Sequence, residues 1–141
     1  MTGAQRITSL LGYAGLIPFV IPALLVVSGS EYSELSLTIA AAYAFGIISF
    51  VCGSWWGMAL NNGSAKALLL SNLYFLTALL IFLFASRWWP LAAAILLMSI
   101  LFAEQNTTLF PGFTDSYRKM RVSLTLVASA SMLALHLSAQ A

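Results

Sequence analysis

Long apolar stretches alternate with short polar connections along the chain, and this pattern predicts five membrane-spanning helices. About 20 apolar residues, at a rise of 1.5 Å each, cover the hydrocarbon core of a bilayer. The predicted helices cover about residues 7–27, 35–60, 66–86, 90–109 and 117–138. We therefore expect an all-α integral membrane bundle of five transmembrane helices that forms one domain over residues 1–141.

The second stretch has no charged residue and carries glycines at helical spacing. Gly53 and Gly57 form a GxxxG pair, and Gly46 falls on the same face of the helix. Small residues let two helix backbones approach closely. We therefore expect this face to seat the first helix, whose own Gly12 and Gly15 suit a close crossing.

The first stretch contains Pro18 and Pro22 near its middle. Proline has no N–H and crowds the carbonyl four residues earlier, so a bend within the membrane is expected. The bend is either an ordinary kink or a hinge beside a cavity lined by freed carbonyls. At residues 7–27 the stretch is longer than the about 7–15 apolar residues of a signal peptide, which favours a retained helix.

The composition excludes a soluble domain, because 61% of the residues are hydrophobic and only 7% are charged, against about 25% in a typical soluble domain. The few cations do not form a nucleic-acid-binding surface. Five of the six fall on the side of the N-terminus, and Arg87 falls on the other side. The positive-inside rule then predicts a cytoplasmic N-terminus and an outside C-terminus.

Metal, cofactor and enzyme chemistry are not expected from the polar residues. Cys52 and His136 are the only cysteine and histidine, and they are far apart in the sequence. Zinc and haem sites usually need several such ligands. Glu31 and Glu34 fall in one outside loop, whereas Asp115 falls at a helix start on the inside, so no paired-carboxylate site can be assembled. We expect a protein that is not an enzyme and has no metal or cofactor.

Glu104 is the strongest single candidate for function. It lies 15 residues beyond Trp89, about 22 Å along a helix, so it should remain at hydrocarbon depth together with Gln105 and Asn106. A carboxylate at that depth needs a partner, and Arg121 near the same end of the next helix is the expected one. The pair either fastens two helices together or handles a proton or ligand.

A second candidate site is a pocket for a planar or amphipathic ligand. Its side chains would be aromatic or amide groups, namely Tyr13, Tyr43, Trp55, Trp56, Asn61, Asn62, Asn72 and Tyr74. Aromatic residues near helix ends are also typical interfacial anchors, and Trp88 and Trp89 are expected to act in that way. Asn72 is expected to form a hydrogen bond between two helices.

Four segments resemble an uncharacterised family of small bacterial membrane proteins, a domain-of-unknown-function family, whose animal relative is the mitochondrial transmembrane protein sixty-nine. The segments are Leu11–Phe19, Tyr43–Phe50, Trp56–Leu60 and Tyr117–Thr125. The resemblance implies a small multi-pass protein of an inner membrane and no particular activity. Because no Arg-rich, Ser-rich presequence is recognised, the bacterial cytoplasmic membrane is the expected location.

Three functions remain open at this point. The first is a non-enzymatic bundle that binds a hydrophobic ligand or a membrane-protein partner within the lipid bilayer. The second is a small carrier or proton-linked channel that uses Pro18, Pro22 and Glu104. The third is an accessory subunit of a larger membrane complex.

Overall fold

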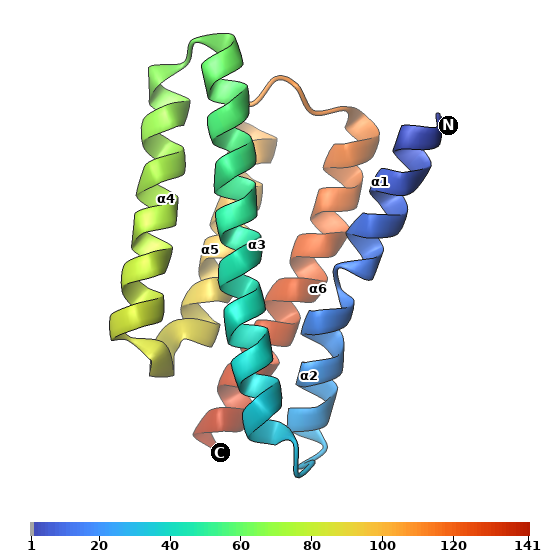
Figure 1. The fold of residues 1–141 in the computed structure, drawn as a ribbon, viewed down its shortest axis with the longest axis vertical. Coiled ribbons are helices and arrows are strands. Elements are labelled where there is room, and N and C mark those ends of the chain that lie inside the picture. The colour runs from blue at the N-terminus through green and yellow to red at the C-terminus, as the bar shows by residue number, and fades with distance from the viewer. Residues whose placement is uncertain (1) are drawn as a thin grey trace.

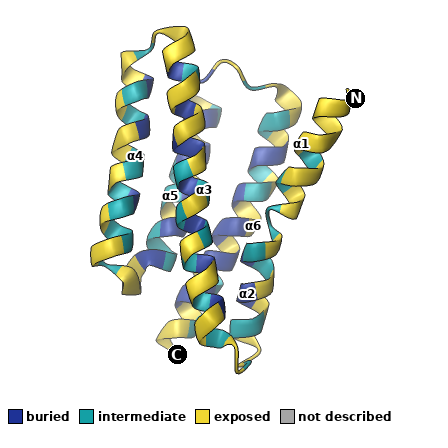
Figure 2. Ribbon diagram, in the orientation of Figure 1, coloured by how far each residue is buried: buried dark blue, intermediate teal, exposed yellow. Residues whose placement is uncertain are grey.

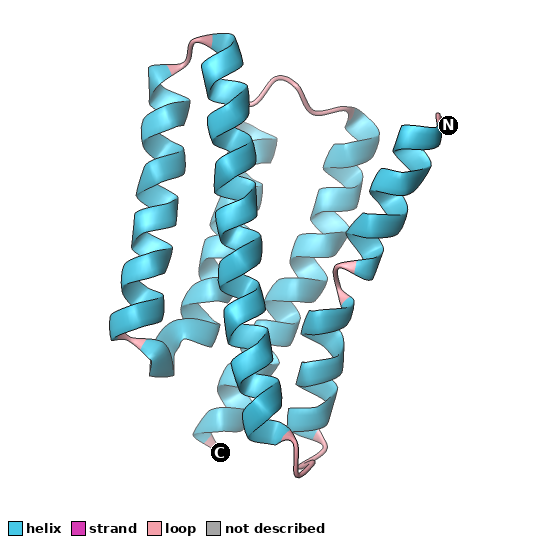
Figure 3. Ribbon diagram, viewed as in Figure 1, coloured by secondary structure: helices cyan, strands magenta, loops and turns pink. Residues whose placement is uncertain are grey.

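The computed structural model describes residues 2–141, and every regular element in that range is a helix (Figure 3). The elements are α1 (Gly3–Ala14), α2 (Ile17–Val27), α3 (Ser33–Asn62), α4 (Ala65–Phe84), the 3-10 helix η1 (Ser86–Trp88), α5 (Trp89–Asn106) and α6 (Asp115–Gln140). Five segments of this range are long and apolar enough to cross a membrane, and α1 with α2 forms one of them. The predicted all-α bundle with five candidate spans is confirmed.

The first span is broken into two helices rather than bent within one. The helix ends after Ala14, and Pro18 takes the second position of α2, where its missing N–H costs no hydrogen bond. The break leaves the Gly15 carbonyl free, and the Tyr43 hydroxyl of α3 donates to it over 2.9 Å. The Phe19 N–H donates to the Leu16 carbonyl instead, so the break between α1 and α2 provides an acceptor for a neighbouring side chain.

The helices pack as two groups that meet in the middle of the molecule (Figure 1). α3 packs against α4 on one side and α2 on the other, while α5 packs mainly against α6. α1 makes few contacts, chiefly with α6, and none of its residues is buried. The two chain ends lie at opposite ends of the bundle (Figure 1).

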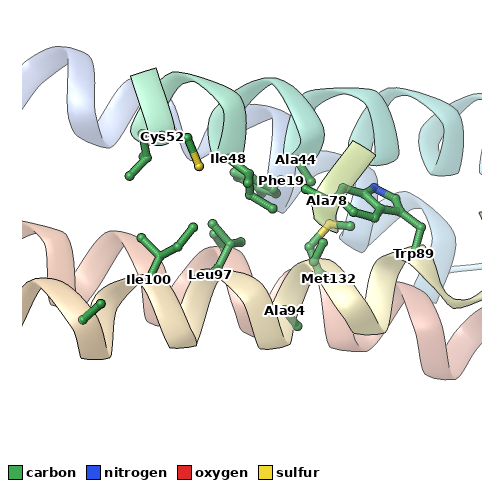
Figure 4. Close-up of a cluster of buried hydrophobic side chains, with 14 of the residues drawn as sticks. Phe19, Ala44, Ile48, Cys52, Ala78, Trp89, Ala94, Leu97, Ile100 and Met132 are labelled. Atoms are coloured by element: carbon green, nitrogen blue, oxygen red, sulfur yellow. The ribbon is translucent and has the colours of Figure 1, made fainter. Parts of the chain in front are cut away.

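One face of α3 lies in the core, and its buried residues are four or seven positions apart in the sequence. Ala40, Ala44, Ile48, Trp55 and Ala59 on this face are all completely buried. Figure 2 shows the buried residues along the inward faces of the helices and the exposed residues on the outward faces. Figure 4 shows how side chains of α3, α5 and α6 meet at the centre. Within a bilayer the hydrophobic effect does not drive helices together, so their association depends on close packing, which small alanines beside large residues allow.

The prediction that the glycine face of α3 seats the first helix is wrong. Gly46, Gly53 and Gly57 are exposed, and a Cβ atom at any of them would meet open space. The alanine face on the other side of α3 makes the helix contacts instead. Gly12 does permit a close approach, but to α6, because a Cβ there would lie 2.9 Å from the Met120 sulfur.

Two further expectations fail at the ends of α5. Trp89 is only 1% exposed and donates through Nε1 to the Ala41 carbonyl over 2.9 Å, so it is a core residue and not an interfacial anchor. Trp88 is exposed, as expected of an anchor. α5 ends at Asn106, three residues before the predicted end at Leu109. The bounds of α3, α4 and α6 lie within two residues of the predicted ones.

Candidate functional site

A buried polar cluster surrounds Glu104 near the end of α5. The carboxylate is 1% exposed and receives Nε of Arg121 on Oε2 over 3.0 Å and Nη2 of Arg121 on Oε1 over 3.3 Å. Trp55 of α3 donates through Nε1 to the same Oε1 over 3.1 Å. A buried carboxylate is tolerated when it is paired and its oxygens accept hydrogen bonds. The ion pair predicted from the sequence is present and joins α5 to α6, and the Trp55 hydrogen bond adds α3 to the cluster.

Sequence reasoning placed Trp55 in a ligand pocket and missed its contact with Glu104. Its indole is completely buried, stacks on Phe110 with ring centroids 4.2 Å apart, and meets Tyr74 edge-on at 5.6 Å. A buried indole N–H usually finds an acceptor, and this rule was the unused signal that could have linked Trp55 to the carboxylate. Phe110 lies in the connection between α5 and α6, so this stacking ties the connection to α3.

Arg118 completes the cluster from the first turn of α6. Its Nη1 donates to the backbone carbonyl of Glu104 over 2.6 Å, and its Nη2 donates to that of Phe110 over 3.3 Å. The last carbonyls of a helix have no partner within the helix and favour a nearby cation. Arg118 therefore caps the C-terminal end of α5. These hydrogen bonds offset the unfavourable interaction of its charge with the dipole of α6.

Three of the amides singled out in the sequence form hydrogen bonds of different kinds. Gln105 donates through Nε2 to the Arg118 carbonyl over 3.2 Å, so it adds to the contact between α5 and α6. Asn106 and Asn72 are exposed and donate to carbonyls four residues earlier in their own helices. The predicted interhelical bond of Asn72 is wrong, because its short side chain is satisfied by its own helix.

A cavity of about 770 Å³ lies between α1, α2, α3, α6 and the connection that precedes α6. Small-molecule sites usually have volumes of about 300–1,000 Å³. Its lining includes polar residues from α1, α3, α6 and the connection before α6, namely Gln5, Thr8, Ser9, Tyr43, Ser54, Thr114, Ser116, Tyr117 and Arg121. Glu104 does not line it, so the Arg121 side chain separates the carboxylate from the cavity.

The predicted aromatic and amide pocket does not exist as one site. Tyr43 lines the large cavity, whereas Trp55 and Tyr74 belong to the core cluster described above. Trp56 and Asn72 line a separate hollow of about 200 Å³ between α3 and α4. Adjacent positions on a helix point in different directions, so residues grouped in sequence are distributed over three places.

Comparisons with known proteins identify relatives but no activity. Residues 4–137 match a family described as protein of unknown function (DUF3429). Transmembrane protein 69 of Xenopus tropicalis is 34% identical over 128 residues, which cover 86% of this chain and 50% of that protein. The chain thus spans about half the length of this curated relative. No solved structure matches the chain.

Proposed function

Because this chain belongs to the DUF3429 family, for which no function is assigned, we propose its function from the structure: it is a non-enzymatic membrane protein that binds a hydrophobic ligand. The observation that carries the proposal is the cavity of about 770 Å³ between α1, α3 and α6. Cavities of this size with an apolar wall and a few polar groups are typical of ligand sites.

The geometry of Glu104 gives less support to a carrier or proton-linked channel. Such a role needs a water path to the carboxylate, but Glu104 is 1% exposed, is paired with Arg121 and does not line the cavity. This favours a structural role for the ion pair. An accessory subunit is expected to bind its partner through a flat apolar face, whereas this bundle has a cavity beside α1.

We also propose that the protein lies in the bacterial cytoplasmic membrane with its N-terminus inside. Figure 1 shows the starts of α1, α4 and α6 at the end of the bundle that carries the N-terminus, and the turn between α4 and α5 at the other end. The first group of helix starts contains Arg6, Lys66, Arg118, Lys119 and Arg121, whereas Arg87 lies in the turn before α5. This orientation places the C-terminus outside the cytoplasm. Alkaline phosphatase fused after Ala141 should therefore be active, and green fluorescent protein fused there should not fluoresce. The reverse result in both fusions would contradict this orientation.

The ligand proposal predicts that the protein retains a small molecule through gentle detergent extraction. Native mass spectrometry should show the intact chain with an additional mass. Ser54→Trp should remove most of that mass, because residue 54 lines the cavity and an indole would occupy the space.

Ser123→Trp is the matched control, because Ser123 is exposed on α6 and does not line the cavity. It should retain the added mass at the wild-type level. The proposal would be contradicted if the wild-type protein carried no bound molecule. It would also be contradicted if Ser54→Trp and Ser123→Trp retained the same added mass.

A further inference from the structure

We infer that the cavity takes an acidic amphiphile, with its anionic head beside Arg121 and its apolar chain directed toward the middle of the bilayer. This inference rests on the proposed ligand-binding function and adds the chemical class of the ligand. Four observations support it: the division of the lining into polar and apolar ends, the single cation in the wall, the unused donor of that cation, and the apolar rim.

The cavity lining changes from polar to apolar along the membrane direction. Figure 1 shows the starts of α1 and α6 at the end of the bundle that carries the N-terminus. Gln5 and Thr8 lie in the first two turns of α1 and Tyr117 lies in the first turn of α6, so these lining residues are near that end. Phe19 of α2 and Ala128 of α6 lie deeper, since Ala128 is seven residues beyond Arg121, about 10 Å along a helix. A molecule with one polar end and one apolar end matches this gradient.

Among residues 2–141, Arg121 is the only charged side chain that lines the cavity. Glu104 lies behind it as its ion-pair partner, and Arg118 is half-buried and does not line the cavity. Arg121–Glu104 is the only ion pair among residues 2–141, and Arg118 is bound to carbonyl oxygens. No acidic side chain lines the cavity. An anion at this end of the cavity would therefore meet one cation and no like charge in the wall.

Arg121 has a donor left for such an anion. Its Nε and Nη2 bind Glu104, and Nη1 makes no hydrogen bond with the part of the chain that the structure describes. A guanidinium has five N–H groups, which allows it to bind one carboxylate and a second acceptor together. The side chain is 7% exposed and lines the cavity, so a second acceptor would reach it from within the cavity.

The rim of the cavity indicates that the ligand comes from the bilayer. Leu11 of α1 and Phe50 of α3 line the cavity and are nonetheless 65% and 74% exposed. The side between α1 and α3 is thus bordered by apolar groups that face hydrocarbon in a membrane. An amphiphile already in the bilayer can place its chain there without passing through water.

The test uses two pairs of amphiphiles that differ in head charge and share their chains. The delipidated wild-type protein would be titrated with oleate and oleyl alcohol, and with dioleoylphosphatidylglycerol and dioleoylphosphatidylcholine, and binding measured by native mass spectrometry. In at least one pair the acidic member should bind about tenfold more tightly, a difference of about 1.4 kcal/mol. The pair that shows this preference identifies a fatty acid or a phospholipid as the source of the anionic head.

Two variants assign the preference to Arg121. Glu104→Gln with Arg121→Gln removes both charges and keeps the shape, and it should bind both members of the pair equally. Arg121→Lys keeps the cation and should retain the preference. Equal binding within both wild-type pairs overturns the inference but leaves the ligand-binding proposal standing, whereas no binding of any of the four contradicts both. A preference that persists in the double variant also overturns the role of Arg121.

Discussion

Replacing Arg121 by alanine is expected to lower the free energy of unfolding by about 3–5 kcal/mol, because it leaves a buried carboxylate without its counter-charge. Glu104 is 1% exposed and receives two hydrogen bonds from Arg121. The one remaining side-chain donor, Nε1 of Trp55, does not neutralise it. Unfolding of the purified protein in dodecyl sulfate, followed by circular dichroism, measures the change.

Lys119→Ala is the matched control for this prediction. Lys119 is an exposed cation two residues earlier on the same helix and forms no ion pair with any of residues 2–141. Its replacement should change the free energy of unfolding by no more than about 0.5 kcal/mol. The double variant Glu104→Gln, Arg121→Gln should be more stable than Arg121→Ala, because no isolated charge remains. Equal effects of Arg121→Ala and Lys119→Ala would show that the pair does not hold the helices together.

The sequence predicted the spans and the ion pair because both depend on local quantities. The number of apolar residues needed to cross a bilayer fixes approximate helix ends, and α3, α4 and α6 begin and end within two residues of those estimates. The cost of a charge at membrane depth required a partner for Glu104, and Arg121 was the cation at a matching depth. Neither inference needs knowledge of how the helices are arranged around one another.

The face that each helix turns toward its neighbours could not be predicted in the same way. Gly46, Gly53 and Gly57 do lie along one side of α3, but that side is exposed. In a membrane both sides of a helix contact apolar material, so hydrophobicity does not mark the inward face. The buried face is instead marked by Ala40 and Ala44, whose small side chains are common elsewhere in the sequence.

The cavity was even less accessible to sequence reasoning, because it depends on the path of α1. Pro18 predicted a bend, but the direction in which α1 leaves α2 depends on the packing of Gly12 against Met120. Residues from several helices and a connection then form the wall. Apart from glycines, only two of the residues predicted to form a site line this cavity, namely Tyr43 and Arg121.

The adjacent residues Trp55 and Trp56 provide the second large prediction. Trp55→Ala should lower the free energy of unfolding by about 3–5 kcal/mol, because it removes a completely buried ring and leaves a void. It also removes the stacking partner of Phe110 and one of the donors to Glu104. The same dodecyl sulfate titration measures the change.

Trp56→Ala is the control, since this indole is 43% exposed and makes no hydrogen bond with residues 2–141. Its effect should stay within about 0.5 kcal/mol. Trp55→Phe should fall between the two, because it keeps an aromatic ring against Phe110 but loses the N–H that binds Glu104. If Trp56→Ala were as destabilising as Trp55→Ala, α3 would have to present a different face to α5 and α6. The inward alanine face, the Glu104 cluster and the cavity wall at Ser54 all depend on that same orientation of α3, so this pair of variants tests them together.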